Sequence, residues 1–147
     1  MKNVVLITGG FDPIHSGHLE YIRAAKDKGD VLVVGLQSDE WLKNKKGAYF
    51  LPFGERCKVL EAVRHVDKVI SFDDSDGTAY RAIEKVKGMY NGDNIIFANG
   101  GDRTAETAPP EESNIQGVTY LWGVGGEKTN SSSVILKKYL DAINKYK

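Results

Sequence analysis

Val4-Val5-Leu6-Ile7-Thr8-Gly9-Gly10-Phe11-Asp12-Pro13-Ile14-His15-Ser16-Gly17-His18 joins an apolar run to two glycines and two histidines, and an amphipathic segment follows it. The apolar run predicts a buried strand, and the segment from residue 16 predicts a helix. A strand that ends in glycines can turn without Cβ clashes, and the first turn of a helix offers unpaired N–H groups and partial positive charge to an anion. The stretch therefore predicts a strand, loop and helix that together bind phosphate.

His15 and His18 are two of the three histidines in the chain. At this spacing both imidazoles are expected on the first helical turn, where both can donate hydrogen bonds to one phosphate. Directed at charge that develops on an α-phosphorus, they would stabilise a transition state more than a ground state. A glycine pair or a histidine alone is more often structural, so the interpretation depends on the whole stretch.

The composition limits the class of protein. At 147 residues the chain is expected to form one domain that buries roughly two thirds of its unfolded surface without disulfides or structural metals. With 20 basic and 20 acidic residues, the zero net charge argues against a nonspecific nucleic-acid protein. The single cysteine, Cys57, is expected as a buried thiol in a reducing compartment. No apolar run approaches the ~20 residues that a membrane span needs, so we expect a soluble, cytoplasmic protein.

Apolar runs alternate along the chain with segments of helical period. Strands are expected near residues 3–8, 31–36, 67–71, 94–98 and 118–122, and helices near 16–28, 38–44, 53–64, 77–88 and 131–145. The run Val31-Leu32-Val33-Val34 is continuously apolar, as burial on both faces of a strand requires. The order predicts a single α/β domain over residues 1–147, with a doubly wound, mainly parallel five-stranded sheet.

The longest segment without a predicted strand or helix runs from Gly100 to Gly117 and contains Pro109-Pro110. A loop of this length in a compact domain is usually functional or mobile. The sequence leaves open whether the segment serves a site or is a solvated excursion.

Gly10-Phe11-Asp12 followed by His15-x-Gly17-His18 resembles the nucleotidyltransferase superfamily with the H-x-G-H motif, in its cytidylyltransferase-like branch. The chain is similar along nearly its whole length to glycerol-3-phosphate cytidylyltransferase, to the heptose-1-phosphate adenylyltransferase domain and to phage-encoded members. The resemblance implies a Rossmann-like fold. It also implies transfer of CMP or AMP from an NTP (CTP or ATP) to a phosphorylated sugar or polyol, such as glycerol 3-phosphate, with release of pyrophosphate.

The resemblance extends to cofactor and assembly. It implies a homodimer. Mg²⁺ is expected to arrive with the NTP, since no Asp/Glu cluster in the sequence suggests a metal site made by the protein. Asp12 is the carboxylate expected either to touch metal-bound water or to orient the loop around it.

The motif residues receive roles from the same resemblance. His15 and His18 would be catalytic groups that contact the NTP phosphates. Gly10, Phe11 and Gly17 would line the nucleotide pocket around them.

A lysine-rich stretch, Lys43-Asn44-Lys45-Lys46-Gly47, matches a mobile loop whose lysines reach the phosphates of both substrates. The resemblance implies a catalytic Lys46, with Lys43 and Lys45 as phosphate-binding residues. Without the other motifs such a run indicates only a solvated turn. Arg56 matches an arginine that faces the active site, and its permanent charge makes it a candidate phosphate ligand.

Asp39 is expected to bind the acceptor, and Trp41, Tyr49 and Phe50 can shape the same pocket. Aromatic residues at such positions more often only pack. The identity of the acceptor and the choice between CTP and ATP stay open, because base selection often relies on backbone groups.

Asn99-Gly100-Gly101-Asp102 matches a glycine–aspartate segment that lines the base and ribose pocket. Gly100 permits close approach of the backbone to a ligand, and Asp102 can accept hydrogen bonds from hydroxyl or amino groups. A plain turn is the alternative interpretation.

Three serines, Ser131, Ser132 and Ser133, correspond to the Ser/Thr-rich motif at the start of the family's last helix. They are expected to bind the β- and γ-phosphates opposite the histidines. One serine at a helix start is ordinarily only a cap. The chain departs from the family just before the serines, where Lys128 stands in for the usual cation with an altered register.

The same residues bear on two other functions. A catalytically weak, nucleotide-binding regulatory module would keep the phosphate cradle, and the departure near Lys128 favours it, whereas His15, His18 and Lys46 count against it. A Rossmann dehydrogenase needs G-x-G-x-x-G after the first strand, which residues 9–14 do not supply. The expected mechanism is in-line attack of an acceptor phosphate on the α-phosphorus without a covalent intermediate.

Overall fold

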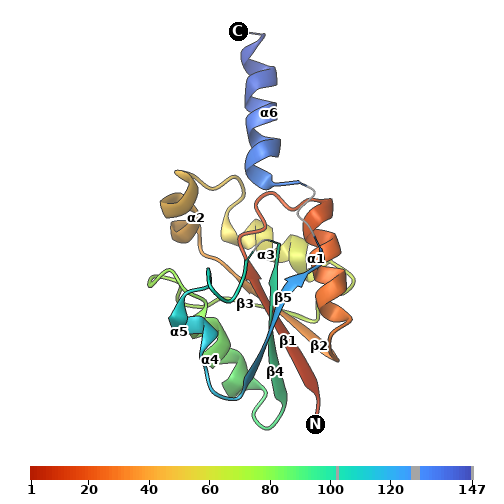
Figure 1. Ribbon diagram of the computed structural model, residues 1–147. Coiled ribbons are helices and arrows are strands. Elements are labelled where there is room, and N and C mark those ends of the chain that lie inside the picture. Colours follow the sequence, from red (N-terminus) through yellow and green to blue (C-terminus); the bar gives the residue numbers. More distant parts are fainter. Residues whose placement is uncertain (102, 127–129, 147) are drawn as a thin grey trace.

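The computed structural model describes residues 1–101, 103–126 and 130–146, which form a sheet with helices on both faces (Figure 1). The strands are β1 (Asn3–Gly9), β2 (Val31–Leu36), β3 (Lys68–Ile70), β4 (Asn94–Gly100) and β5 (Val118–Val124). The helices are α1 (Ser16–Lys26), α2 (Asp39–Lys46), α3 (Phe53–Glu61), α4 (Tyr80–Met89), α5 (Pro110–Ser113) and α6 (Ser132–Asn144).

The sheet has five parallel strands in the order β3-β2-β1-β4-β5. The chain moves outward from β1 through β2 to β3, and then crosses back to β4 and β5 on the other side. The order of strands therefore reverses between β1 and β4, and in such sheets the crevice outside the carboxyl ends of these strands is where ligands bind. This architecture confirms the predicted α/β, Rossmann-like sheet.

Alternate residues of β1 enter two different cores, as the period of two in a strand requires. Val5 and Ile7 pack in the core that α1 and α3 cover, with helical residues that include Ile22 and Leu60. On the opposite face, Val4 and Leu6 pack in the core that α4 covers, where the helical residues are Ala82, Ile83 and Val86. Full burial of one such aliphatic side chain contributes about 1.5–3 kcal/mol, so the two cores hold the carboxyl ends of β1 and β4 in place.

Helix α6 extends away from the rest of the protein, beyond the carboxyl ends of the strands (Figure 1). Its beginning is anchored, because the buried Ser132 hydroxyl donates to the Pro13 carbonyl at 2.8 Å. Further along, the helix exposes apolar side chains at helical spacing. They are Tyr139, Leu140 and Ile143.

The helix predicted near residues 38–44 is α2, and it extends to Lys46. The resemblance placed Lys43 to Gly47 in a mobile loop, but the lysines form the last turn of this helix. Ser38 caps the start of this helix by accepting the Trp41 N–H at 3.1 Å, and Gly47 ends it in the left-handed conformation (φ 89°). Gly47 makes a helix end here possible, because glycine adopts positive φ without strain.

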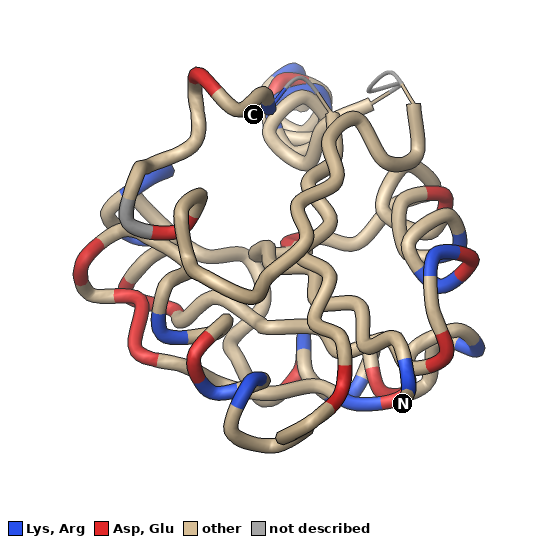
Figure 2. The backbone as a smooth tube through the Cα atoms, turned by 60° about the horizontal axis from the view of Figure 1, so that its bottom comes forward, with Lys and Arg blue, Asp and Glu red and all other residues tan. Residues whose placement is uncertain are grey.

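Charges of both signs are interspersed around the outside of the fold (Figure 2). No described helix combines the length and the apolar character that crossing a membrane would require. Cys57, expected to be buried, is only half-buried, and burial raises the pKa of its thiol, which disfavours a reactive thiolate.

Candidate active site

Two adjoining cavities open at the carboxyl ends of β1 and β4. The first, of about 520 Å³, extends along the end of β4 toward the turn after β5. The second, of about 590 Å³, extends toward α2, the start of α4 and the start of α6. The residues that line both are Thr8, Gly9, Gly10, Phe11, His15, His18, Lys45 and Arg103. The motif loop is therefore shared between two compartments.

The two histidines form the cap of α1 by exchanging hydrogen bonds with the backbone. His15 precedes the helix, and its Nδ1 accepts the Gly17 N–H at 3.0 Å. His18 lies in the first turn, and its Nδ1 accepts the His15 N–H at 3.1 Å. The rings stack with their centroids 3.8 Å apart, and Phe11 meets His18 edge-on at 5.0 Å. Helix capping and ring stacking together fix both imidazoles.

This arrangement determines which ring nitrogen carries the proton. A nitrogen that accepts a backbone N–H bears no hydrogen, so the neutral form of each imidazole carries its hydrogen on Nε2. In both rings Nε2 is the nitrogen opposite the capping bond, and both rings line both cavities. Each ring thus uses Nδ1 for the helix cap and keeps the hydrogen of its neutral form on Nε2, the nitrogen that is not part of the cap.

The loop between β1 and α1 depends on small residues and one unusual conformation. A Cβ on Gly10 would lie 2.8 Å from Leu42 Cδ2, so helix α2 can approach the loop only over a glycine. Phe11 is buried with a positive φ of 49°. Both residues line both cavities, as the prediction of a nucleotide pocket requires, and Gly17 lines the first.

Asp12 holds a distant loop in place. Its carboxylate is 2% exposed and accepts the N–H groups of Phe50 at 2.6 Å and Leu51 at 2.7 Å. Both oxygens are therefore used by the segment between α2 and α3. Of the two roles expected for Asp12, the geometry fits loop orientation.

The lysines of α2 are directed to different places. Lys45 lines both cavities and lies over the Trp41 ring, with Nζ 4.6 Å from the centroid. Lys46 lines the second cavity, as does Trp41. Lys43 lies over Tyr49 at 5.6 Å and lines neither cavity. The structure thus brings Lys45 and Lys46 to the site and leaves Lys43 outside it.

Arg56 differs from its expected role as a phosphate ligand. Its side chain is wholly buried and lines neither cavity. The guanidinium donates to the carbonyl oxygens of Leu51, Gly10 and Gln37 at 2.9, 3.0 and 2.8 Å. It also pairs with Asp39 Oδ1 at 2.6 Å. These protein groups occupy the guanidinium, so Arg56 is a structural residue that ties α3 to the motif loop, and Asp39 is its partner rather than an acceptor ligand.

The end of β4 forms the wall of the first cavity. Asn99, Gly100 and Gly101 line it. A Cβ on Gly100 would lie 2.8 Å from Cε1 of Tyr21, so the need for glycine there comes from packing rather than from a ligand. Gly101 adopts a positive φ of 61° with open space beside it. The open space that a ligand needs to approach the backbone closely, expected at Gly100, is therefore found at Gly101.

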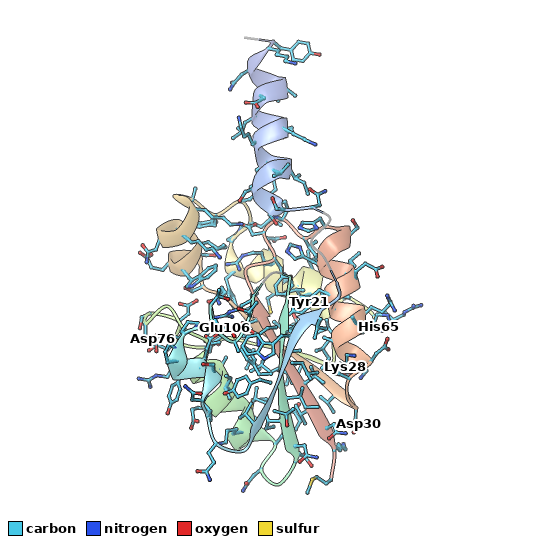
Figure 3. The ribbon with its side chains drawn as sticks, in the orientation of Figure 1. Tyr21, Lys28, Asp30, His65, Asp76 and Glu106 are labelled. Atoms are coloured by element: carbon cyan, nitrogen blue, oxygen red, sulfur yellow. The ribbon has the colours of Figure 1, made fainter. Side chains whose placement is uncertain are left out.

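Tyr21 is a site residue that the sequence did not reveal. It points from α1 toward the central strands (Figure 3), and its hydroxyl donates to the Ala98 carbonyl at 2.5 Å. A Cβ on Gly125 would lie 3.0 Å from the Cα of Tyr21, so Tyr21 packs tightly between Gly100 and Gly125. Burial raises the pKa of Tyr21, which keeps its hydroxyl protonated as a donor. The residue shapes the first cavity without offering it a charge.

The three serines at the start of α6 line the second cavity together with both histidines. Ser131 caps the helix, and its hydroxyl accepts the Val134 N–H at 3.1 Å. Ser132 donates to Pro13 in the motif loop, which anchors the helix start beside the histidines. Ser133 is exposed. The starts of α1 and α6 therefore line the same cavity.

Two predicted nucleotide-binding residues, Asp102 and Lys128, lie outside the described residues. His65 lies at the edge of the molecule, on the far side of α1 from the labelled acidic residues Asp76 and Glu106 (Figure 3). Within the described part of the chain, no group of three or more His, Cys, Asp or Glu side chains is placed to hold a metal ion.

The segment after β4 supplies several cavity residues that no motif indicated. Arg103 of this segment lines both cavities, and its Thr107 and Glu112 line the second, together with Thr78 from the loop before α4. Gln37 from the end of β2 completes this polar wall. The one indication of these residues in the sequence was the unusual length of the segment between residues 100 and 117, which left open whether that segment serves a site or is solvated. Its position beside the cavities fits the first of these interpretations.

Comparison with known proteins agrees with this geometry. The model of the family described as cytidylyltransferase-like matches residues 6–137, which include the histidine loop and the serines. The chain belongs to the cytidylyltransferase-like family.

Curated relatives of this family member are bifunctional proteins. The protein named bifunctional protein HldE from Geobacter metallireducens is 33% identical over 146 residues, which cover 94% of this chain and 28% of the relative. HldE from Citrobacter koseri is 36% identical over 128 residues, 86% of this chain and 24% of the relative. The chain thus spans about a quarter of the length of these relatives.

Among solved structures, a lipopolysaccharide core biosynthesis protein from Thermoplasma volcanium is similar with a TM-score of 0.67 and 25% identity. The match covers 84% of this chain and 95% of that one. A protein of unknown function from Archaeoglobus fulgidus shares the fold, with a TM-score of 0.53 and 17% identity over 86% of this chain and 93% of that one.

Proposed function

We propose that this protein transfers CMP or AMP from CTP or ATP to a phosphorylated sugar or polyol and releases pyrophosphate. The observation that carries the proposal is the stacked pair of His15 and His18, which lines two adjoining cavities as a set of Nε2–H donors. Both cavities fall within the roughly 300–1,000 Å³ typical of small-molecule sites. Two compartments that meet at phosphate-binding donors suit a reaction between two phosphorylated substrates.

The residues that line the cavities support a division of the two substrates between them. The first cavity, with backbone at Asn99, Gly100 and Gly101 and the side chain of Tyr21, offers flat surfaces and backbone polar groups for a base and ribose. The second, with Lys46 and the three serines, offers cationic and hydroxyl groups for phosphates and the acceptor. The nucleotide would span the junction, with its α-phosphate at the histidines.

In the proposed reaction an acceptor phosphate oxygen attacks the α-phosphorus in line. The new P–O bond forms as the bond from the α-phosphorus to the bridging oxygen of the β-phosphate breaks, and that electron pair leaves on pyrophosphate. The Nε2–H groups of His15 and His18 donate to the α-phosphate oxygens as their charge increases. The first turn of α6 and Lys45 would hold the departing phosphates. Positioning and electrostatics supply the catalysis.

Mg²⁺ is proposed to arrive bound to the triphosphate, where it would offset part of the phosphate charge. The carboxylate of the motif loop is consistent with Mg²⁺ that is carried by the triphosphate. Asp12, the carboxylate in the motif loop, is committed to the N–H groups of Phe50 and Leu51, so the described loop leaves the cation to the phosphates.

Pyrophosphate release tests the proposal. The purified protein would be incubated with Mg²⁺, each of CTP, ATP, UTP and GTP, and a panel of acceptors that includes glycerol 3-phosphate and several sugar 1-phosphates. We expect turnover with CTP or ATP and one class of acceptor, and none from His15→Ala. His65→Ala is the matched control, since His65 lies outside both cavities. Binding of an NTP without pyrophosphate release from any pair would instead favour the regulatory module.

We also propose that the protein is a homodimer. What supports this is the exposed apolar side of α6, where Tyr139, Leu140 and Ile143 share one face of the helix. The helix extends from the protein body (Figure 1), so a second copy can reach it without obstructing the cavities.

A further inference from the structure

Arg103 lies where the two cavities meet, although no motif includes it. It lines both of them, together with the histidines and Lys45. Its side chain is 33% exposed. Among the described residues its guanidinium pairs with Glu112 through Nη2 and donates to Asn99 Oδ1 through Nη1 at 3.3 Å. These contacts use two of the five N–H donors of a guanidinium, so others can serve a ligand in the cavities.

Glu112 holds Arg103 in this position. The carboxylate is 1% exposed, one oxygen contacts Arg103, and the other accepts the Ala79 N–H at the start of α4 at 2.5 Å. Burial raises the pKa of Glu112. A buried carboxylate is costly in free energy, and its two partners come from different elements, so the pair fixes the loop after β4 against α4.

Gln37 lies in the wall of the same second cavity. It is 7% exposed, and its Oε1 has no hydrogen-bond partner among the described residues. A buried amide oxygen without a partner costs about 1–3 kcal/mol, and such groups in native proteins generally have a partner. A ligand hydroxyl would supply the missing donor. Thr78 and Thr107 add two further hydroxyls to this wall.

The chemistry of this wall distinguishes the two substrates. Arg103 and Glu112 together are electrically neutral, and the carboxylate would repel a triphosphate. The pair with Gln37 instead matches a ligand that carries a single phosphate and several hydroxyls. The polyphosphate is proposed to lie against the lysines and the start of α6, which line the same second cavity.

We infer that Arg103 binds the phosphate of the acceptor, that Glu112 is its positioning residue, and that Gln37 accepts a hydrogen bond from a hydroxyl of the same acceptor. The inference rests on the proposed function and names the acceptor end of that site: a polyhydroxylated monophosphate, held by residues outside the H-x-G-H motif.

Steady-state kinetics of the full chain test the inference, with pyrophosphate release measured while each substrate is varied separately. Loss of a charge-assisted hydrogen bond predicts that Arg103→Gln raises the acceptor KM at least about tenfold, with the NTP KM within about twofold. Arg103→Lys keeps the positive charge but lacks the planar pair of N–H donors of a guanidinium, so its acceptor KM should lie between those of wild type and Arg103→Gln. Gln37→Leu should raise the acceptor KM about three- to tenfold, the worth of one hydrogen bond.

Glu112→Gln has nearly the same shape and keeps an acceptor for the Ala79 N–H. We expect it to raise the acceptor KM, and the double variant with Arg103→Gln to be no worse than Arg103→Gln alone, because the two residues act as one unit. Arg81→Gln is the matched control, since Arg81 is exposed on α4 and lines neither cavity. Thermal unfolding of each variant shows whether it is folded. If Arg103→Gln does not fold, the acceptor KM of Arg103→Lys tests the inference instead.

The outcomes separate the inference from the proposed function. Turnover by the wild type with an acceptor KM unchanged in Arg103→Gln and Arg103→Lys would overturn the inference and leave the function standing. A rise confined to the NTP KM would do the same, because it would place Arg103 on the nucleotide. Absence of pyrophosphate release by the wild type with every pair would overturn both.

Discussion

The backbone N–H of His15 donates to Nδ1 of His18 at 3.1 Å, and the two rings stack with centroids 3.8 Å apart. The residues proposed to bind the α-phosphate are therefore also the cap of α1. Because each Nδ1 is an acceptor for the backbone, the capping function and the ligand-binding function belong to different nitrogens of the same ring.

Two substitutions of His18 separate these functions. His18→Asn places an amide oxygen near the position of Nδ1, so it should keep the cap but lose the Nε2–H donor, and kcat should fall about 100-fold or more. His18→Gln places an amide nitrogen near Nε2 instead, so it should retain more activity and lose about 1 kcal/mol of stability with the cap. Pyrophosphate release and urea unfolding measure the two effects. Equal turnover in His18→Asn and wild type would remove His18 from the chemistry.

Arg56 is expected to control stability rather than phosphate binding. Arg56→Met leaves three carbonyl oxygens without their donor and Asp39 without its partner, and we expect a loss of about 3 kcal/mol, the lower end for a broken buried pair because Asp39 is partly exposed. Chemical denaturation checks this. The exposed Arg64→Met should change stability by no more than about 0.5 kcal/mol. A stable Arg56→Met protein with weakened NTP binding would restore the phosphate role.

Gly100 is expected to tolerate no side chain while Tyr21 is present. In Gly100→Ala the new Cβ would meet Cε1 and Cδ1 of Tyr21 at 2.8 and 2.9 Å. Overpacking of this kind costs about 1–3 kcal/mol. Combination with Tyr21→Leu should cost less than the sum of the two single changes, because the clash is removed. Urea unfolding of the four proteins measures the coupling, and strict additivity would show that Tyr21 is not what excludes the methyl group.

Glu112 should make stability depend on pH in a defined direction. Burial raises the pKa of Glu112 above its unfolded value, so the folded state binds this proton more tightly. That contribution is fully present below the unfolded pKa and is lost as the pH rises through the folded pKa. The stability of wild type relative to Glu112→Gln should therefore decrease as the pH rises from the unfolded pKa of a glutamate, about 4.3, through the higher folded pKa. Unfolding curves across this range test the sign, and an increase would mean that Arg103 outweighs burial.

The apolar side of α6 gives a prediction about assembly. Leu140→Glu adds a charge to the exposed patch, and in a dimer formed through α6 it should produce monomers, because a buried unpaired charge is costly. Light scattering after size-exclusion chromatography measures the mass. Lys138→Glu, a charge change outside the patch, is the control. A wild-type protein that is monomeric at all concentrations would contradict the proposed dimer.

Local patterns were sufficient to predict the strands and most of the helices. The continuous apolar runs at residues 4–7 and 31–34 are β1 and β2, and the histidine motif lies where β1 ends and α1 begins. The helix near residues 38–44 was predicted with Ser38 as its cap, but it continues to Lys46 and ends at Gly47, so the mobile lysine loop that the resemblance implied is a helical turn here. Helix α4 starts at Tyr80 rather than near residue 77, and the N–H of the residue before it, Ala79, is satisfied by Glu112, 33 positions away.

What the sequence by itself determined is the class of fold, the position of the histidine loop at the end of the first strand, and the place of His15 and His18 at the start of the first helix. These follow from residues adjacent in the chain, whose backbone preferences and hydrogen bonds act over a few positions. Only the tertiary structure decided that Arg56 is buried with Asp39, that Tyr21 requires Gly100, and that Arg103 and Glu112 reach the site. These relationships join residues separated by up to 79 positions, and burial and pairing at such separations depend on how the elements pack, which no local pattern encodes.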